Sequence, residues 1–381
     1  MTVAAALLSL AACQSRPTEK QVPAAVLPVA PDSATAADRA APPGPAAAPF
    51  TGYRRYVGTV GKLPVVVELS LEADSTGKTV HCLGSYYYVR NAGSLQLKAD
   101  GPLRPGQPLR LHESAGENQP VTGRWEAGQP AGPVLSGTWI SPRGRRQPFS
   151  LREDYSDAVR FEILTEEVRG AACDPEDTVE HAWGPNGTLS REYLHLLGDD
   201  TLHSARRRLQ CPPRARRRQQ LRAQVENCAE QEEGLAVTFN GYGLLSLEYS
   251  RYSYGFGGAH PNHGGSAVIY DLRRGRPLGL AELLRPNTDS LLQLRLRHHL
   301  LHDPGLAGAQ EGYFFDDDEL PPLPRGGGSL TPAGLLFRYD DYEVAAYAFG
   351  NPAVLLSYRE LRPLLRPGTP LARMLQQRGL W

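Results

Sequence analysis

The sequence predicts two folded regions: an all-β region that forms a meander or small barrel, then an α+β region with an antiparallel sheet and helices packed on one face. The first observation is a period of two along 65–72, where Val65, Val67, Leu69 and Leu71 alternate with mostly polar residues. The second is the recurrence of similar short segments about every ten residues as far as residue 154, separated by turn residues. The third is a change beyond residue 155, where alternating segments are mixed with segments of helical spacing.

Residues 1–13 are expected to be a lipoprotein signal peptide. An apolar run at 3–10 leads into Leu10-Ala11-Ala12-Cys13, which resembles the bacterial lipobox. Acylation of Cys13 would anchor the chain in a membrane, and no other segment approaches the ~18–20 apolar residues needed to span one. The pattern predicts a cell-envelope protein, lipid-anchored on the periplasmic or outer surface. Residues 1–2 lack the usual positive charge, which leaves a cytosolic protein as the alternative.

Residues 14–50 are rich in Ala and Pro and have almost no aromatic or β-branched side chains. Such a segment cannot bury enough apolar surface to offset its chain entropy. We expect it to be a flexible tether.

Residues 51–154 are expected to form the β-rich domain. Tyr86, Tyr87 and Tyr88 place aromatic rings on both faces of one strand, and Trp125 and Trp139 are placed for cross-strand packing. A small barrel is normally filled by side chains, so a filled core is favoured over a ligand-binding cup. The further strands are expected at 84–90, 94–98, 109–113, 122–126, 135–140 and 149–153.

Residues 155–381 are expected to form the α+β domain. Segments of period two predict strands, and segments with apolar residues three or four apart predict helices. The strands are expected at 159–166, 235–239, 244–254, 267–272, 335–339 and 353–357. The helices are expected at 202–209, 214–231, 278–284, 290–302 and 358–365.

The second region resembles the C-terminal domain of the RsiV-like proteins, a bacterial extracytoplasmic family that is mostly a domain of unknown function. The resemblance is closest over 240–366. The first region is similar to the small β-rich domain that precedes RsiV-like domains in some envelope lipoproteins, through the run GSYYY at 84–88. The motifs that carry the resemblance are Gly257-Gly258-Ala259-His260, Asp271-Leu272, Tyr342-Glu343-Val344-Ala345 and Ser357-Tyr358-Arg359-Glu360-Leu361.

The resemblance implies binding rather than catalysis. In RsiV the extracytoplasmic domain of an anti-sigma factor recognises lysozyme, and other members accompany peptidoglycan deacetylase domains. We see neither a sigma-binding segment nor a deacetylase region, and carry over neither activity. We therefore expect a non-catalytic, lipid-anchored envelope protein, whose partner is a muramidase-like (lysozyme-like) protein or wall glycan of the peptidoglycan. We expect no cofactor.

A loop crowded with glycine and histidine is the candidate binding loop. Its glycines suit positive φ angles, so a structural loop is the simplest interpretation, with ligand contact as the next. The alternative is a metal-assisted hydrolase that acts on envelope glycan through His260, His263 and a carboxylate from an expected strand at 340–343. The sequence contains no G-x-S-x-G, S-x-x-K or H-E-x-x-H motif that would indicate another reaction. The candidate residues of the loop are Tyr254, Gly257, Gly258, His260, Asn262 and His263.

Cysteines and charges add three expectations. Cys211 and Cys228 flank a helical stretch and form a candidate disulfide outside the cytoplasm. Arginine clusters at 206–208 and 214–218 could contact anionic glycan or lipid headgroups. The chain carries 41 basic and 41 acidic side chains, so its net charge of +0 argues against nucleic acid as a partner.

Overall fold

The computed structural model describes residues 52–74, 76, 79–103, 107–116, 118–128, 132–172, 186–198, 209–306, 312–316 and 319–381. Residues 48–381 form one compact unit. The proposed lipidation site Cys13, the tether at 14–50, most of the expected helix at 202–209 and the 206–208 arginine cluster lie outside the described residues. Within the described part of the chain, no helix is both long enough and apolar enough to cross a membrane.

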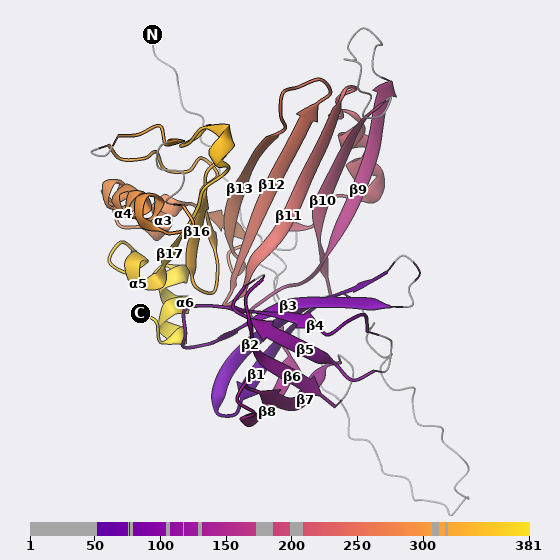
Figure 1. The fold of residues 1–381 in the computed structure, drawn as a ribbon, viewed down its shortest axis with the longest axis vertical. Coiled ribbons are helices and arrows are strands. Elements are labelled where there is room, and N and C mark those ends of the chain that lie inside the picture. The colour runs from indigo at the N-terminus through magenta and orange to yellow at the C-terminus, as the bar shows by residue number, and fades with distance from the viewer. Residues whose placement is uncertain are drawn as a thin grey trace, which may run out of the picture. The chain divides into compact units, whose positions relative to one another are not determined.

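The first region is a closed barrel of eight antiparallel strands, each paired with its neighbour in sequence and with β1 paired to β8. Figure 1 shows it in indigo and purple. The predicted small barrel is therefore confirmed. Its strands are β1 (Gly52–Val60), β2 (Leu63–Ala73), β3 (Val80–Tyr88), β4 (Leu95–Ala99), β5 (Arg110–Ser114), β6 (Val121–Ala127), β7 (Val134–Ile140) and β8 (Arg146–Glu153).

Side chains fill the barrel. The alternating residues of β2 point inward, and Val65, Val67, Leu69 and Leu71 are at most 1% exposed. Aromatic rings pack beside them, with the ring centroid of Trp125 4.9 Å from those of Tyr86 and Phe149. The period of two thus specifies which face of each strand forms the core.

One carboxylate is buried inside this barrel. Glu113 is 3% exposed and accepts hydrogen bonds from Tyr86 (2.6 Å), Trp139 (2.8 Å), Trp125 (3.3 Å) and Thr122 (2.8 Å). A buried charge is tolerated where its lone pairs are satisfied, and these four donors satisfy it.

The second region is built on a six-stranded sheet in the order β14-β13-β12-β11-β10-β9. All neighbours are antiparallel except β10 and β11, which pair in parallel over residues 188–191. The expectation of a purely antiparallel sheet is therefore wrong at this pair. A parallel pair needs a long crossover connection, and the stretch that contains helix α2 supplies it. The strands are β9 (Arg160–Ala172), β10 (Asn186–Leu197), β11 (Ala229–Gly241), β12 (Leu244–Gly255), β13 (Asn262–Asp271) and β14 (Arg276–Leu278).

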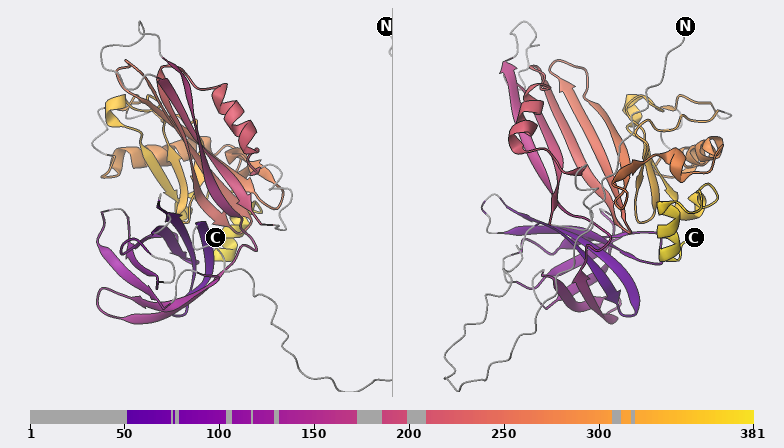
Figure 2. Two further views of the ribbon diagram at one scale, coloured as in Figure 1. Left: turned by 90° about the vertical axis from the view of Figure 1, so that its right-hand side faces the viewer. Right: turned by 180° about the vertical axis from the view of Figure 1, so that it is seen from behind.

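Helices lie on both sides of this sheet, not on one face as expected. Helix α2 (Arg214–Arg222) packs Leu221 against Val168 and Leu189 of β9 and β10. The remaining helices pack on the opposite side, as the left view of Figure 2 shows. They are α3 (Leu280–Leu283), α4 (Asp289–His302), α5 (Tyr358–Leu361) and α6 (Pro370–Arg378).

A small second sheet lies among these helices. Its three antiparallel strands are β15 (Gly328–Leu330), β16 (Gly334–Arg338) and β17 (Ala353–Ser357). One core joins this sheet and the helices to Phe239, Leu244 and Ile269 of the large sheet. The described part of the chain is therefore mostly β, with few helices.

Three expected elements end differently in the structure. The helix expected at 214–231 stops at Arg222, and residues 229–231 already belong to β11. The helix expected at 358–365 stops at Leu361, and α6 follows it. Residues 340–343 form a turn rather than a strand, with Tyr342 at a φ of 59° and the Glu343 amide donating to the Asp340 carbonyl.

Two buried arginines join the barrel to the second region. Arg55 of β1 donates to the carbonyls of Asn240 (2.9 Å) and Asp154 (2.8 Å). Arg378 of α6 is 0% exposed and donates to carbonyls of both regions. These bonds explain why the two regions form one compact unit.

Candidate functional site

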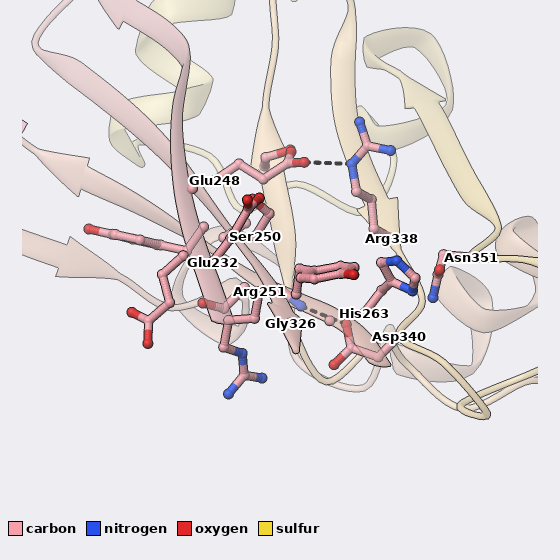
Figure 3. A pocket seen from close by; sticks show the side chains of 18 of the residues that line it. Glu232, Glu248, Ser250, Arg251, His263, Gly326, Arg338, Asp340 and Asn351 are labelled. Carbon is pink, nitrogen blue, oxygen red and sulfur yellow. Dashed lines mark hydrogen bonds and ion pairs between the residues drawn. The ribbon is translucent and has the colours of Figure 1, made fainter. Parts of the chain in front are cut away.

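A groove lies between the large and the small sheet. It has a volume of about 490 Å³ and is lined by residues of β9 to β13, of β15 and β16, and of the loops beside them. Figure 3 shows side chains from both sheets converging on it. The groove is the candidate functional site.

The strand pairing explains which side chains enter the groove. Because side chains alternate along a strand, Ser246, Glu248, Ser250 and Tyr252 of β12 share one face. The first of these is buried in the core, and the next three line the groove. One face of β12 therefore lies in the core at residue 246 and lines the groove at residues 248–252.

Small residues of β13 allow the loop after β16 to approach. Gly264 lies directly under Asp340, because a β-carbon on Gly264 would come within 3.1 Å of its carboxylate. The Gly265 amide donates to Asp340 Oδ1 at 2.8 Å. On the other side, the Ala267 amide donates to the Gly326 carbonyl at 2.6 Å. The glycine pair therefore positions Asp340 at the edge of the groove.

An ion pair crosses the groove between the two sheets. Arg338 Nε of β16 lies 2.5 Å from Glu248 Oε1 of β12, and Ser329 Oγ donates to Glu248 Oε2 at 2.8 Å. Figure 3 shows this pair on the opposite side of the groove from Asp340. These contacts fix the small sheet against the large one and leave the space between them open.

His263 is the one member of the candidate loop that lines the groove. It pairs with Tyr252 across the strands, and the two ring centroids are 5.5 Å apart, edge to face. Its side chain is 42% exposed, and Nδ1 lies 3.3 Å from Asp341 Oδ2, which also accepts the His263 amide. The turn at 340–343 therefore does bring a carboxylate to this histidine.

His260 has a different role. Its Nδ1 is 2.8 Å from the Pro261 carbonyl, which can only accept, so Nδ1 carries the proton. Nε2 then accepts from the Tyr342 hydroxyl at 2.8 Å, and the ring stacks on Tyr347 with centroids 3.8 Å apart. Both nitrogens are engaged, which leaves no lone pair free for a metal ion.

The other members of the candidate loop lie outside the groove, and contacts within the loop hold most of them. Gly257 has a φ of 90°, the Gly258 amide donates to the Gly255 carbonyl at 2.8 Å, and the Tyr254 hydroxyl donates to the Gly258 carbonyl at 3.1 Å. Asn262 is exposed at the start of β13. Among the described residues, no group of three or more His, Cys, Asp or Glu side chains is arranged to hold a metal ion.

The expected disulfide between Cys211 and Cys228 is wrong. Cys211 has a free thiol, whereas Cys228 is disulfide-bonded. The reason is that Cys228 lies next to β11, beyond the true end of α2, whereas Cys211 precedes that helix beside Arg217, with Sγ 3.5 Å from Nη1. The expected helix at 214–231 was too long, so the sequence spacing of the two cysteines could not show that they are not paired.

Three arginines of the cluster at 214–218 pair with one buried carboxylate, that of Glu166. Arg217 is 7% exposed and lies 2.8 Å from the buried Glu166, which Arg214 also approaches to 3.2 Å. Burial would raise the pKa of Glu166, but the hydrogen bonds and charges of Arg217 and Arg214 outweigh burial and lower it. These contacts join α2 to β9.

Sequence reasoning missed most groove residues. Glu248, Arg338 and Asn351 come from strands and loops distant in sequence, and only folding brings them together. One local signal was present: residues 248, 250 and 252 are polar or amphipathic on a strand whose opposite face carries Leu245 and Leu247. A polar face on a central strand indicates that something other than core covers it.

No known family model matches the sequence, and no curated protein matches it. Solved structures of DUF3298 family proteins are similar in structure. One, from Pseudomonas aeruginosa PAO1, is 23% identical over 56% of this chain and 97% of its own, with a TM-score of 0.40. Another, from Bacteroides fragilis NCTC 9343, is 16% identical over 59% of this chain and 100% of its own, with a TM-score of 0.45. The resemblance to RsiV-like proteins stays a prediction.

Proposed function

We propose that the protein is a non-catalytic, lipid-anchored binding protein of the cell envelope, and that it takes a segment of wall glycan into the groove between its two sheets. The observation that carries this proposal is the groove itself. Its volume of about 490 Å³ suits a small ligand, since such sites commonly span ~300–1,000 Å³.

The lining suits a sugar chain. Pyranose rings present many hydroxyl groups on a partly apolar ring, so their sites need hydrogen-bonding side chains and aromatic surface together. The groove offers both, through Glu232, Ser250 and Asn351 beside the rings of Tyr252 and His263. A concave polar site of this kind favours glycan over the second candidate, a muramidase-like protein.

The envelope location is part of the proposal. It rests on the lipobox-like run that ends at Cys13 and on the Ala/Pro-rich tether that follows. Expression with a labelled fatty acid would test the anchor. We expect label in the wild-type chain and none in Cys13→Ser, and equal labelling of both would overturn lipidation at this residue.

The glycan site is tested by calorimetry with soluble cell-wall oligosaccharides and, separately, with lysozyme. Ser250→Trp fills the groove, and Leu291→Trp is its matched control, because Leu291 is 51% exposed on α4 and does not line the groove. We expect oligosaccharide binding that Ser250→Trp abolishes and Leu291→Trp retains. Absence of oligosaccharide binding by the wild type, or binding indifferent to Ser250→Trp, would overturn the proposal. Binding of lysozyme alone would favour the protein partner instead.

A further inference from the structure

The groove is acidic. Five carboxylates line it, from Glu192, Glu232, Glu233, Glu248 and Asp340. Two arginines also line it, Arg251 and Arg338. Since the whole chain is neutral, this excess of negative charge is a local property of the site.

Internal ion pairs do not remove the excess. Glu248 is neutralised by Arg338 at 2.5 Å, and Glu233 by Arg191 at 2.5 Å. That leaves Glu192, Glu232 and Asp340, because Arg251 lies between Ser250 and Tyr252 on β12 and so points to the opposite face of the sheet.

The three remaining carboxylates are open to a cationic partner. Glu192 accepts from the Leu235 amide at 2.7 Å and Asp340 from the Gly265 amide at 2.8 Å, which satisfies lone pairs without cancelling charge. The side chain of Glu232 makes neither a hydrogen bond nor an ion pair with any described residue, and Figure 3 shows it extending away from the Glu248–Arg338 pair. The free charges therefore lie at different points along the groove.

A fourth carboxylate lies behind His263. The side chain of Asp341 is 6% exposed, and Oδ1 is buried without a hydrogen-bond partner among the described residues. Buried polar atoms of this kind are rare and costly. Asp341 adds negative potential at the end of the groove where His263 and Asp340 lie.

We infer that the ligand of this groove carries protonated amines: a glycan whose amino sugars are de-N-acetylated, rather than the neutral N-acetylated chain. This inference rests on the proposed glycan site and names its ligand class. An ammonium group supplies three donors and a charge opposite to that of the lining, whereas an acetamido group supplies one donor and no charge. Unpaired carboxylates in a cleft create a negative electrostatic potential, which attracts a cationic ligand and repels an anionic one.

Calorimetry with β-1,4-linked glucosamine and N-acetylglucosamine oligomers of equal length tests the inference, at a pH where the free amines are protonated. We expect the amine form to bind about tenfold tighter, and the preference to shrink as salt is added. Glu232→Gln should reduce the preference. Glu72→Gln should leave the preference intact. It removes the same charge, but Glu72 lies on the barrel strand β2 and does not line the groove.

The outcomes separate the two proposals. Equal affinity for both oligomers, with binding still lost in Ser250→Trp, would overturn the amine preference and leave the glycan site standing. A preference unchanged by Glu232→Gln and by salt would overturn the electrostatic basis of the inference. Binding of neither oligomer would overturn the glycan site and this inference together.

Discussion

The guanidinium group of Arg378 lies over the ring of Tyr87, with Cζ 4.8 Å from the ring centroid. The two residues belong to the last helix and to a barrel strand. Arg378 also donates to the carbonyls of Val89 (3.0 Å), Asn91 (2.7 Å) and Pro332 (2.9 Å). The buried cation is thus stabilised by carbonyl dipoles and by an aromatic face. A planar guanidinium can stack on a ring while its N–H groups donate to carbonyls in its own plane, and a compact ammonium group has no such plane.

Removal of Arg378 should therefore destabilise both regions together. Arg378→Ala leaves three carbonyls without a donor and opens a cavity between α6 and β3, so we expect a loss of about 3 kcal/mol in the free energy of unfolding. Urea denaturation measures it. Arg373→Ala is the control, because Arg373 is exposed on the same helix and its side chain donates to the Gly368 carbonyl of the same region. Equal losses in the two variants would contradict a joining role for Arg378.

Glu113 should stabilise the barrel through its four donors. Glu113→Ala leaves the buried donors of Tyr86 and Trp125 and the half-buried indole N–H of Trp139 unpaired, so we expect a loss of about 3–5 kcal/mol in the free energy of unfolding. Burial and the nearby Glu113 carboxylate raise the pKa of Tyr86, which keeps its hydroxyl a donor. Thermal unfolding, followed by near-ultraviolet circular dichroism of the tryptophans, measures the effect.

The matched control for the barrel carboxylate is Glu126→Ala. Glu126 lies on the neighbouring strand β6, is 47% exposed and pairs with Arg146 at 3.6 Å. Such a pair is worth ~0–1 kcal/mol. If Glu113→Ala unfolds no earlier than Glu126→Ala, the buried network does not stabilise the barrel.

His299 should make stability depend on pH. Its Nε2 lies 2.7 Å from Glu360 and its Nδ1 3.0 Å from Asp303. Burial alone would lower the pKa of His299, but the two carboxylates outweigh it and raise the pKa above 6.5. Burial would likewise raise the pKa of Glu360, but hydrogen bonds from Ser357 and His299 lower it below 4.5.

The sign follows from these directions. Because the pKa of His299 is raised, its contribution to the stability of the folded state is complete below pH 6.5 and is lost as the pH rises through the folded-state pKa. The contribution of Glu360, whose pKa is lowered, is instead lost as the pH falls below 4.5. The difference in unfolding free energy between wild type and His299→Gln should therefore be larger near pH ~5.5 than near pH ~8.5. His298→Gln, on the exposed face of the same helix, should show no such change. A difference that grows with pH would refute the assignment.

The sequence predicts the parts of the fold that depend on local patterns better than the parts that depend on contacts between distant residues. The barrel follows from alternation along β2, since one face must be buried. The helix expected at 214–231 is too long because residues 229–231 pair with 253–255 of β12, and this pairing overrides local propensity. The strand expected at 340–343 is a turn, since Glu343 accepts the amides of Asp340 and Arg325 and holds the chain there.

The site was less predictable than the fold. The glycine-histidine loop drew attention to the right region, and His263 does line the groove. Both ring nitrogens of His260 are used in hydrogen bonds to Pro261 and Tyr342. Composition alone could not distinguish such a structural histidine from a ligand-binding one. The Glu248–Arg338 pair joins residues 90 apart in sequence, and no local pattern specifies such a meeting.

The cysteines should differ in reactivity. Cys82 is 2% exposed, and burial raises its pKa to about 12, so little thiolate is available. Cys211 is a partly exposed free thiol, and Cys228 is disulfide-bonded. Alkylation followed by mass spectrometry should label Cys211 in the folded protein, Cys82 only after unfolding, and Cys228 only after reduction. Modification of Cys228 in unreduced, unfolded protein would contradict the disulfide.

Arg338→Gln gives the most discriminating test of groove electrostatics, because its effect should oppose that of Glu232→Gln. Arg338 is 54% exposed and Glu248 18%, so loss of their pair should cost only ~0–1 kcal/mol of stability. It frees the Glu248 carboxylate inside the groove, and we expect several-fold tighter binding of the glucosamine oligomer. Arg146→Gln, which breaks the barrel pair with Glu126, should leave affinity unchanged. Weaker binding by Arg338→Gln would show instead that the guanidinium itself contacts the ligand, and the ligand would then be recognised through its acceptors rather than through an amine.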